Sequence, residues 1–96
     1  MYSSSEIEQM LQEMKPDLIR DFSVSRIGYF GSYALGNQEP DSDLDLLVEF
    51  SKPIGWRFFT LETYLTKSLG LRVDLVTPGA LIERIKESIL AQVRYV

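Results

Sequence analysis

Three aspartates carry the clearest chemical signal in this sequence. Asp43 and Asp45 lie in residues 43–50, where apolar and other side chains alternate as they do in a strand with one buried face. Successive side chains of a strand point to opposite faces, so the two carboxylates share a face and lie roughly 6–7 Å apart. Asp74 stands between apolar neighbours in a second short strand, and adjacent strands are about 4.8 Å apart. We therefore expect the three carboxylates to converge.

Such a cluster requires a cation, because unpaired like charges at this distance raise one another's pKa. Carboxylate oxygens suit Mg²⁺ or Mn²⁺, and a magnesium ion held by a few carboxylates usually completes its shell with water and phosphate oxygens. Gly31 and Ser32 follow an apolar stretch and could hold those phosphates through close backbone amides and a hydroxyl. We predict that Asp43, Asp45 and Asp74 are catalytic and metal-binding, and that Gly31 and Ser32 bind a nucleotide.

Composition excludes several other chemistries. The 96 residues contain no cysteine and no histidine, so disulfides, thiolate metal sites and histidine-based catalysis are ruled out. A net charge of −4 argues against direct binding of a polynucleotide. The sequence has no signal peptide pattern and no apolar run long enough for a membrane span, so we expect a cytoplasmic protein with no membrane association.

The elements that must position these residues can be predicted from periodicity. We expect a first helix over about residues 5–14, with Pro16 kinking it or starting a second short helix. Strands are predicted at Val24–Phe30, at 43–50 and at 72–76. A helix at 54–69 separates the last two strands.

A final helix is predicted to open at Thr77-Pro78. Its inward-facing apolar residues are expected to be Leu81, Ile82, Ile85, Ile89 and Val93. Leu90, Tyr95 and Val96 would leave apolar surface that a partner or a second copy in a homo-oligomer could cover.

The order α-β-loop-β-α-β-α predicts a single α/β (α+β) domain over residues 1–96. The helix between the second and third strands is long enough for a crossover, so these strands should be parallel neighbours. The first strand joins the second through a loop without a full helix and should pair with it antiparallel. We expect a small mixed sheet with helices packed on one face.

The glycine and aspartate motifs resemble those of a known family, the minimal nucleotidyltransferases, small relatives of the DNA polymerase β superfamily. The family pattern is Gly-Ser-x-Ala-Arg-Gly followed by Ser-Asp-x-Asp-Leu. This chain has Gly31-Ser32-Tyr33-Ala34-Leu35-Gly36 and Ser42-Asp43-Leu44-Asp45-Leu46, with ten residues between Ser32 and Asp43. Leu35 is the one departure, in place of arginine, and the third family acid corresponds to Asp74.

The resemblance implies the family's α-β-x-β-α-β core and an Mg²⁺-dependent nucleotidyltransferase that uses ATP or another nucleoside triphosphate. Family members commonly act as antitoxins that transfer AMP to a tyrosine of a HEPN-domain toxin. By the same resemblance, Asp43 and Asp45 would hold the nucleotide's metal, and Asp74 would lie beside the attacking oxygen. Two alternatives remain: an antitoxin with weak or no catalysis that neutralises its partner by binding, which Leu35 favours, and a nucleotide sensor that binds ATP without transfer.

Overall fold

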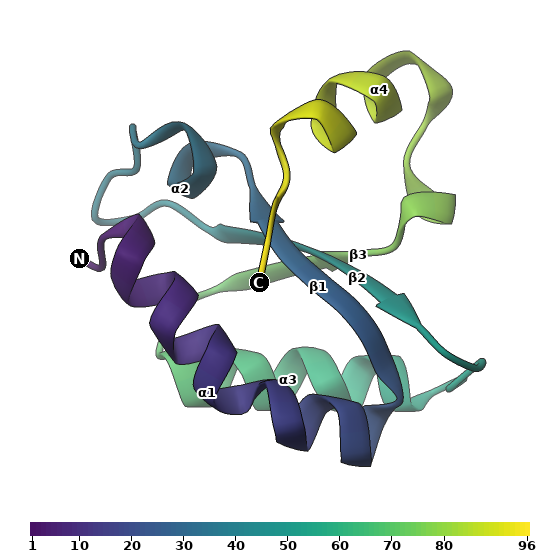
Figure 1. Ribbon diagram of the computed structural model, residues 1–96. Coiled ribbons are helices and arrows are strands. Elements are labelled where there is room, and N and C mark those ends of the chain that lie inside the picture. Colours follow the sequence, from purple (N-terminus) through teal and green to yellow (C-terminus); the bar gives the residue numbers. More distant parts are fainter.

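A computed structural model describes all residues from 1 to 96 (Figure 1). Helices and strands alternate along the chain, beginning with the longest helix. Their bounds, in chain order, are α1 (Ser4–Phe22), β1 (Val24–Phe30), α2 (Ser32–Leu35), β2 (Leu44–Phe50), α3 (Arg57–Leu69), β3 (Val73–Val76), the 3₁₀ turn η1 (Pro78–Ala80), α4 (Glu83–Gln92) and β4 (Arg94–Tyr95).

The strands form one mixed sheet in the order β3-β2-β1-β4. β1 pairs antiparallel with β2 on one side and with β4 on the other, whereas β2 and β3 are parallel. The crossover through α3 accounts for the parallel pair, as expected for a helical connection of this length. The predicted mixed sheet is confirmed, and the two-residue strand β4 is an addition that the sequence pattern did not indicate.

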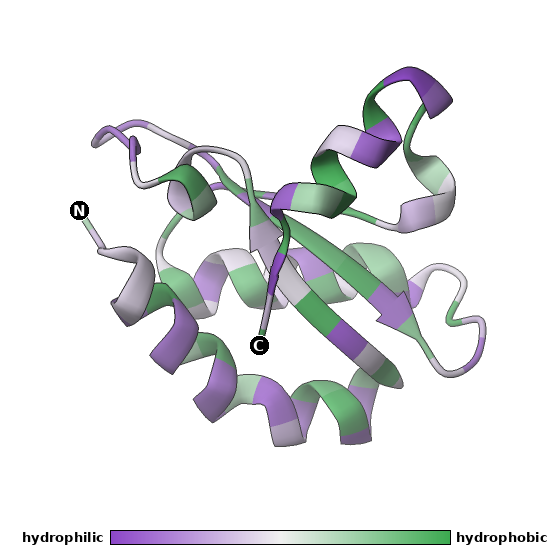
Figure 2. Ribbon diagram, turned by 45° about the horizontal axis from the view of Figure 1, so that its top comes forward, coloured by the Kyte–Doolittle hydropathy of each residue, from purple (hydrophilic) through white to green (hydrophobic).

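The main core lies between the sheet and the helices α1 and α3, which cover one face (Figure 1). Hydrophobic and hydrophilic bands alternate along both helices, as expected when one stripe of each is buried (Figure 2). Ile7, Leu11 and Leu18 of α1 and Leu61 and Leu65 of α3 are fully buried in this core. The alternating apolar residues of β2 point into this core. Side chains alternate along a strand, so the polar residues of β2 are directed to the opposite face of the sheet.

α1 runs as one helix to Phe22, so the predicted end near residue 14 and the alternative of a second helix starting at Pro16 were wrong. The buried residues Leu11 and Leu18 lie on either side of the proline, and packing of this stripe outweighs the loss of one helical hydrogen bond. The helix starts at Ser4, where Ser3 and Glu6 form a capping box. α3 begins at Arg57 rather than at residue 54. It ends at Leu69, and Gly70, in a left-handed conformation, is its C-cap as predicted.

α4 differs most from expectation. It begins at Glu83 after a separate 3₁₀ turn, and it lies over the sheet face opposite α1 and α3 (Figure 1). None of its residues is fully buried, and Ile82 and Ile85 are 54% and 43% exposed. The predicted inward stripe was therefore wrong, because α1 and α3 already fill the core face. No helix in the chain combines the length and the apolar character that crossing a membrane requires.

Candidate active site

Parallel pairing of β2 and β3 brings Asp45 and Asp74 side by side, since the two residues are register partners. Register partners in a sheet project to the same face. Asp45 is half-buried and Asp74 is exposed. Burial, then the charge of Asp74, then that of Asp43 raise the pKa of Asp45 to about 6. The site therefore concentrates negative charge on a partly desolvated carboxylate, which a bound cation would stabilise.

Gly31 lies against Asp45 on the side of β1, opposite Asp74. The register pairs Asp45 with Phe30, the last residue of β1, and Gly31 follows directly. Gly31 has φ +72° and ψ −147°, a region that L-amino acids with side chains avoid. A Cβ atom at this position would overlap Oδ2 of Asp45. Glycine is required here by backbone conformation and by space, and the turn is thereby pressed against the carboxylate.

Asp43 lies just before β2 and is exposed. Its Oδ1 forms an ion pair with Nε of Arg72, at a distance of 2.9 Å. Arg72 also directs its guanidinium toward the carbonyl of Asp41, at 3.4 Å. Asp43 is close enough to contribute to the raised pKa of Asp45, yet its carboxylate is paired with the guanidinium of Arg72, the residue just before β3.

Of the three carboxylates that we expected to converge, those of Asp45 and Asp74 belong to register partners on adjacent strands. No group of three or more acidic side chains is arranged to hold one metal ion. The strand starts at Leu44, so Asp43 lies outside the ladder that fixes Asp45 and Asp74, and its carboxylate is paired with Arg72. Asp45 and Asp74 are the pair whose oxygen donors and shared charge fit a divalent cation such as Mg²⁺.

Ser32 opens the short helix α2 and is half-buried. Its position directly after Gly31 places it next to the Asp45 side of the site. Leu35, at the other end of α2, is 63% exposed. The departure from the family motif therefore lies at the surface and is not accommodated by the core.

Gln92 is a site residue that sequence reasoning missed. It is the last residue of α4, and its Oε1 accepts a hydrogen bond from the backbone N–H of Gly31 at 2.8 Å. Its Nε2 is directed to the carbonyl of Ser88, at 3.4 Å. The C-terminal end of α4 thus reaches the glycine turn, and the Gly31 amide that we expected to contact phosphate is already bonded within the chain. No local sequence signal marks a glutamine for this contact across 61 residues.

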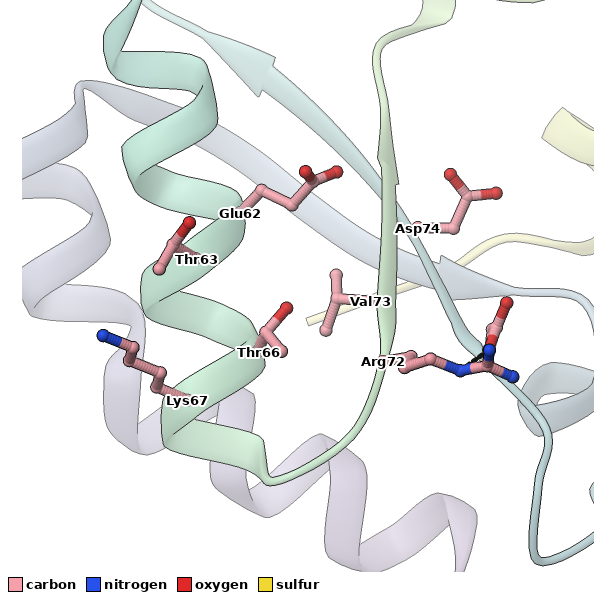
Figure 3. Close-up of a pocket in the computed structure, with 8 residues that line it drawn as sticks. Glu62, Thr63, Thr66, Lys67, Arg72, Val73 and Asp74 are labelled. Atoms are coloured by element: carbon pink, nitrogen blue, oxygen red, sulfur yellow. Dashed lines mark ion pairs between the residues drawn. The ribbon is translucent and has the colours of Figure 1, made fainter.

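A polar cavity of about 450 Å³ adjoins the acidic residues along β3. α3 forms its opposite wall, from which Glu62, Thr66 and Lys67 project (Figure 3). The full lining is Asp43, Glu62, Thr63, Thr66, Lys67, Arg72, Val73 and Asp74. Val73 points toward α3, whereas Asp74 lies on the other side of the strand (Figure 3). The cavity therefore reaches the acidic site around the edge of the sheet.

Comparisons with known proteins agree with this arrangement. Residues 7–96 match the nucleotidyltransferase domain family. The chain is 44% identical to protein adenylyltransferase MntA of Thermococcus cleftensis, over 100% of this chain and 98% of that protein. A solved structure assigned as a minimal nucleotidyltransferase superposes with a TM-score of 0.81 at 30% identity, covering 97% of this chain and 95% of the other.

A more distant match has the same fold. It is a solved complex of a tri-AMPylated HEPN toxin from Shewanella oneidensis with an MNT antitoxin. It superposes with a TM-score of 0.58 at 20% identity, covering 96% of this chain and 66% of the other. The matched domain, the full-length relative and the glycine and aspartate motifs at the ends of β1 and β2 agree. The chain therefore belongs to the nucleotidyltransferase domain family and, within it, to the minimal nucleotidyltransferases.

Proposed function

We propose that this nucleotidyltransferase transfers AMP from ATP to a tyrosine hydroxyl of a HEPN-domain partner and thereby acts as its antitoxin. The observation that carries the proposal is the position of Asp45, which lies against Gly31 on one side and is the register partner of Asp74 on the other. It joins a turn suited to phosphates to a carboxylate pair suited to a divalent cation. The adenylyltransferase relative and the AMPylated HEPN toxin in the distant complex support the choice of reaction and partner.

The residues divide the work as follows. Asp45 and Asp74, joined by Asp43 when it leaves Arg72, hold Mg²⁺ or Mn²⁺. Ser32, joined by the Gly31 amide when it leaves Gln92, holds the phosphates of the nucleotide. When bound, the metal offsets the charge of the triphosphate and of the leaving pyrophosphate. Asp74 accepts the proton of the acceptor hydroxyl, whose oxygen bonds to the α-phosphorus. The bond from that phosphorus to the β-phosphate's bridging oxygen breaks, and pyrophosphate leaves.

Asp74 suits the role of base because of its place in the sheet. It is exposed and lies on the outermost strand, so an acceptor can approach it from solvent. Asp45 is half-buried between β1 and β3, which leaves it less accessible to a second protein. The two adjacent carboxylates therefore differ in environment, as expected when one serves the cation and the other also faces the acceptor.

Labelled ATP tests the proposal. The purified chain, MgCl₂, ATP labelled in the α-phosphate and a HEPN-domain partner should give label on that partner. Asp43→Ala, Asp45→Asn and Asp74→Asn should each abolish labelling, while Glu49→Gln, which alters an acid further along β2, should not. A HEPN partner with its acceptor tyrosine changed to phenylalanine should stay unlabelled. Absence of label with the wild-type chain at saturating ATP contradicts the proposed transfer.

A second candidate function is neutralisation by binding alone. Two observations favour it: the ion pair between Asp43 and Arg72, and Leu35 in place of the family arginine. An Asp43→Ala/Asp45→Ala double variant separates the two functions. If covering the partner suffices, the double variant still neutralises its toxicity in cells. If AMP transfer is required, neutralisation is lost although the complex still forms.

A further inference from the structure

β3 forms one edge of the sheet, and its outer side has no strand partner. The Leu44 N–H donates to the carbonyl of Arg72 at 2.9 Å, which fixes the phase of the parallel ladder. In such a ladder, every second residue of a strand bonds to the same neighbour. The backbone groups of Arg72 and Asp74 therefore face β2, and those of Val73 and Leu75 point to the open edge.

β3 is short, with four residues, and carries the charge of Asp74, but no strand covers its outer side. Natural sheets usually shield an edge with proline, with lysine or with a covering element, and the strand Val73–Val76 contains neither residue. The polar cavity runs beside the edge instead of a covering chain, between β3 and α3, whose Glu62 and Thr66 point toward β3 (Figure 3). The open backbone groups and the space beside them occur together next to the acidic site.

We propose that an extended segment of the acceptor protein pairs with β3 as an added strand and presents its hydroxyl residue beside Asp74. The inference rests on the proposed function, because it concerns how the acceptor of that transfer is held. Asp45 and Asp74 are register partners on adjacent strands. A strand added beside β3 would have one residue in register with Asp74, and that residue would extend the row formed by the two aspartates. Strand spacing sets that residue about 4.8 Å from Asp74.

The geometry also selects the kind of acceptor segment. Side chains alternate along the added strand, so a hydroxyl residue on the acidic face has neighbours that face the cavity. Most residues that line the cavity are polar or charged, Glu62, Thr63, Thr66 and Lys67 among them, which suits polar neighbours. A tyrosine hydroxyl extends further from the sheet than the aspartate carboxylates, toward a phosphate held above them. A serine hydroxyl would end short of the carboxylate oxygens.

Proline at position 73 provides a selective test. Val73→Pro removes one outward N–H without removing a donor of the β2 ladder, and proline is tolerated on edge strands. Val73→Ala shortens the side chain but keeps the N–H, so it is the matched control. We expect Val73→Pro to raise the KM for the HEPN partner at least tenfold, with unchanged affinity for Mg²⁺ and ATP, while Val73→Ala stays within twofold of wild type. Equal effects of both variants, or none of either, overturn the inference.

A second pair of variants tests the cavity without altering β3, in case Val73→Pro impairs folding. Thr66→Trp fills the space beside the edge, whereas Thr60→Trp adds the same side chain to α3 away from that cavity. Only Thr66→Trp should weaken labelling of the partner. In the wild type, partner binding should slow hydrogen exchange of the Val73 and Leu75 amides.

The two proposals can fail separately. If the wild type labels the partner while Thr66→Trp labels it equally well and the Val73 and Leu75 amides stay unprotected, strand addition is wrong and AMP transfer stands. If the wild type never labels the partner but these amides become protected, transfer is wrong and the edge still binds the partner.

Discussion

The carboxylate of Asp45 lies directly against the backbone of Gly31, so closely that residue 31 has no room for a Cβ atom. Gly31 directly follows β1 and Asp45 lies near the start of β2, and their contact joins the predicted phosphate turn to the predicted metal ligand. A change at either residue should therefore affect both functions of the site.

Gly31→Ala should abolish nucleotide transfer by displacing Asp45. The new methyl group meets Oδ2 of Asp45 and also imposes backbone strain of about 1–3 kcal/mol. Gly36→Ala is the matched control, because Gly36 also has a positive φ, +76°, but no atom lies within 4 Å of an added Cβ. Gly36→Ala should lose about 1–2 kcal/mol of stability and keep most of its activity. Similar transfer rates for the two variants would show that the contact with Asp45 is unimportant.

Asp45→Asn should stabilise the metal-free protein at neutral pH. Burial, Asp74 and Asp43 raise the pKa of Asp45 from its ordinary value of 3.8 to about 6. The folded state therefore holds this proton more tightly than the unfolded state, and the stability it contributes is lost as the pH rises from about 4 through 6. Solvent screening of a half-buried carboxylate limits the gain of Asp45→Asn at pH 7.5 to about 1 kcal/mol.

Urea unfolding in EDTA at several pH values measures this difference. The advantage of Asp45→Asn should shrink as the pH falls from 7.5 to 4, because Asp45 is then protonated in the wild type as well. A difference between the two proteins that does not change with pH would mean that Asp45 is not destabilised by its neighbours.

Divalent cation should stabilise the wild type at pH 7.5 by relieving the same repulsion. At a concentration ten times Kd, binding to the folded state alone adds about 1.4 kcal/mol to the free energy of unfolding. Asp45→Asn and Asp74→Asn should lose this response in thermal unfolding with MgCl₂ or MnCl₂. Glu49→Gln should retain it, since Glu49 pairs with Arg26 at 3.8 Å and does not belong to the carboxylate pair. An equal response in all four proteins would place the cation elsewhere.

Gln92→Met should loosen the glycine turn. Methionine keeps the length of the side chain but lacks the oxygen that accepts the Gly31 N–H. We expect a loss of about 1 kcal/mol of stability, faster hydrogen exchange of the Gly31 amide and a changed KM for ATP. Gln92→Glu retains an acceptor oxygen and should preserve slow exchange. If methionine and glutamate give the same exchange rate, Gln92 does not hold the turn.

Much of this arrangement could be predicted from the sequence, because it depends on local pattern. Alternation along residues 43–50 identified β2 and the shared face of its polar residues, and the helical crossover identified the parallel pairing with β3. Those two inferences are sufficient to bring Asp45 and Asp74 together.

The remainder depends on contacts between distant segments. The ion pair of Arg72 with Asp43 depends on β3 lying parallel to β2 and beginning just after Arg72, so the sequence pattern did not indicate it. The apolar spacing of residues 81–93 predicted a buried helix. The pattern could not show that the core face was already filled, or that Gln92 would reach Gly31. β4 is too short and too polar to give a strand signal.

The most direct test is anomalous diffraction from Mn²⁺ in crystals of the wild-type chain grown with MnCl₂ and a non-hydrolysable ATP analogue. A manganese peak bonded to carboxylate oxygens of Asp45 and Asp74, with the analogue's phosphates against Gly31 and Ser32, is the predicted result. A peak that lies away from both aspartates, or a bound analogue with no manganese between them, would contradict it.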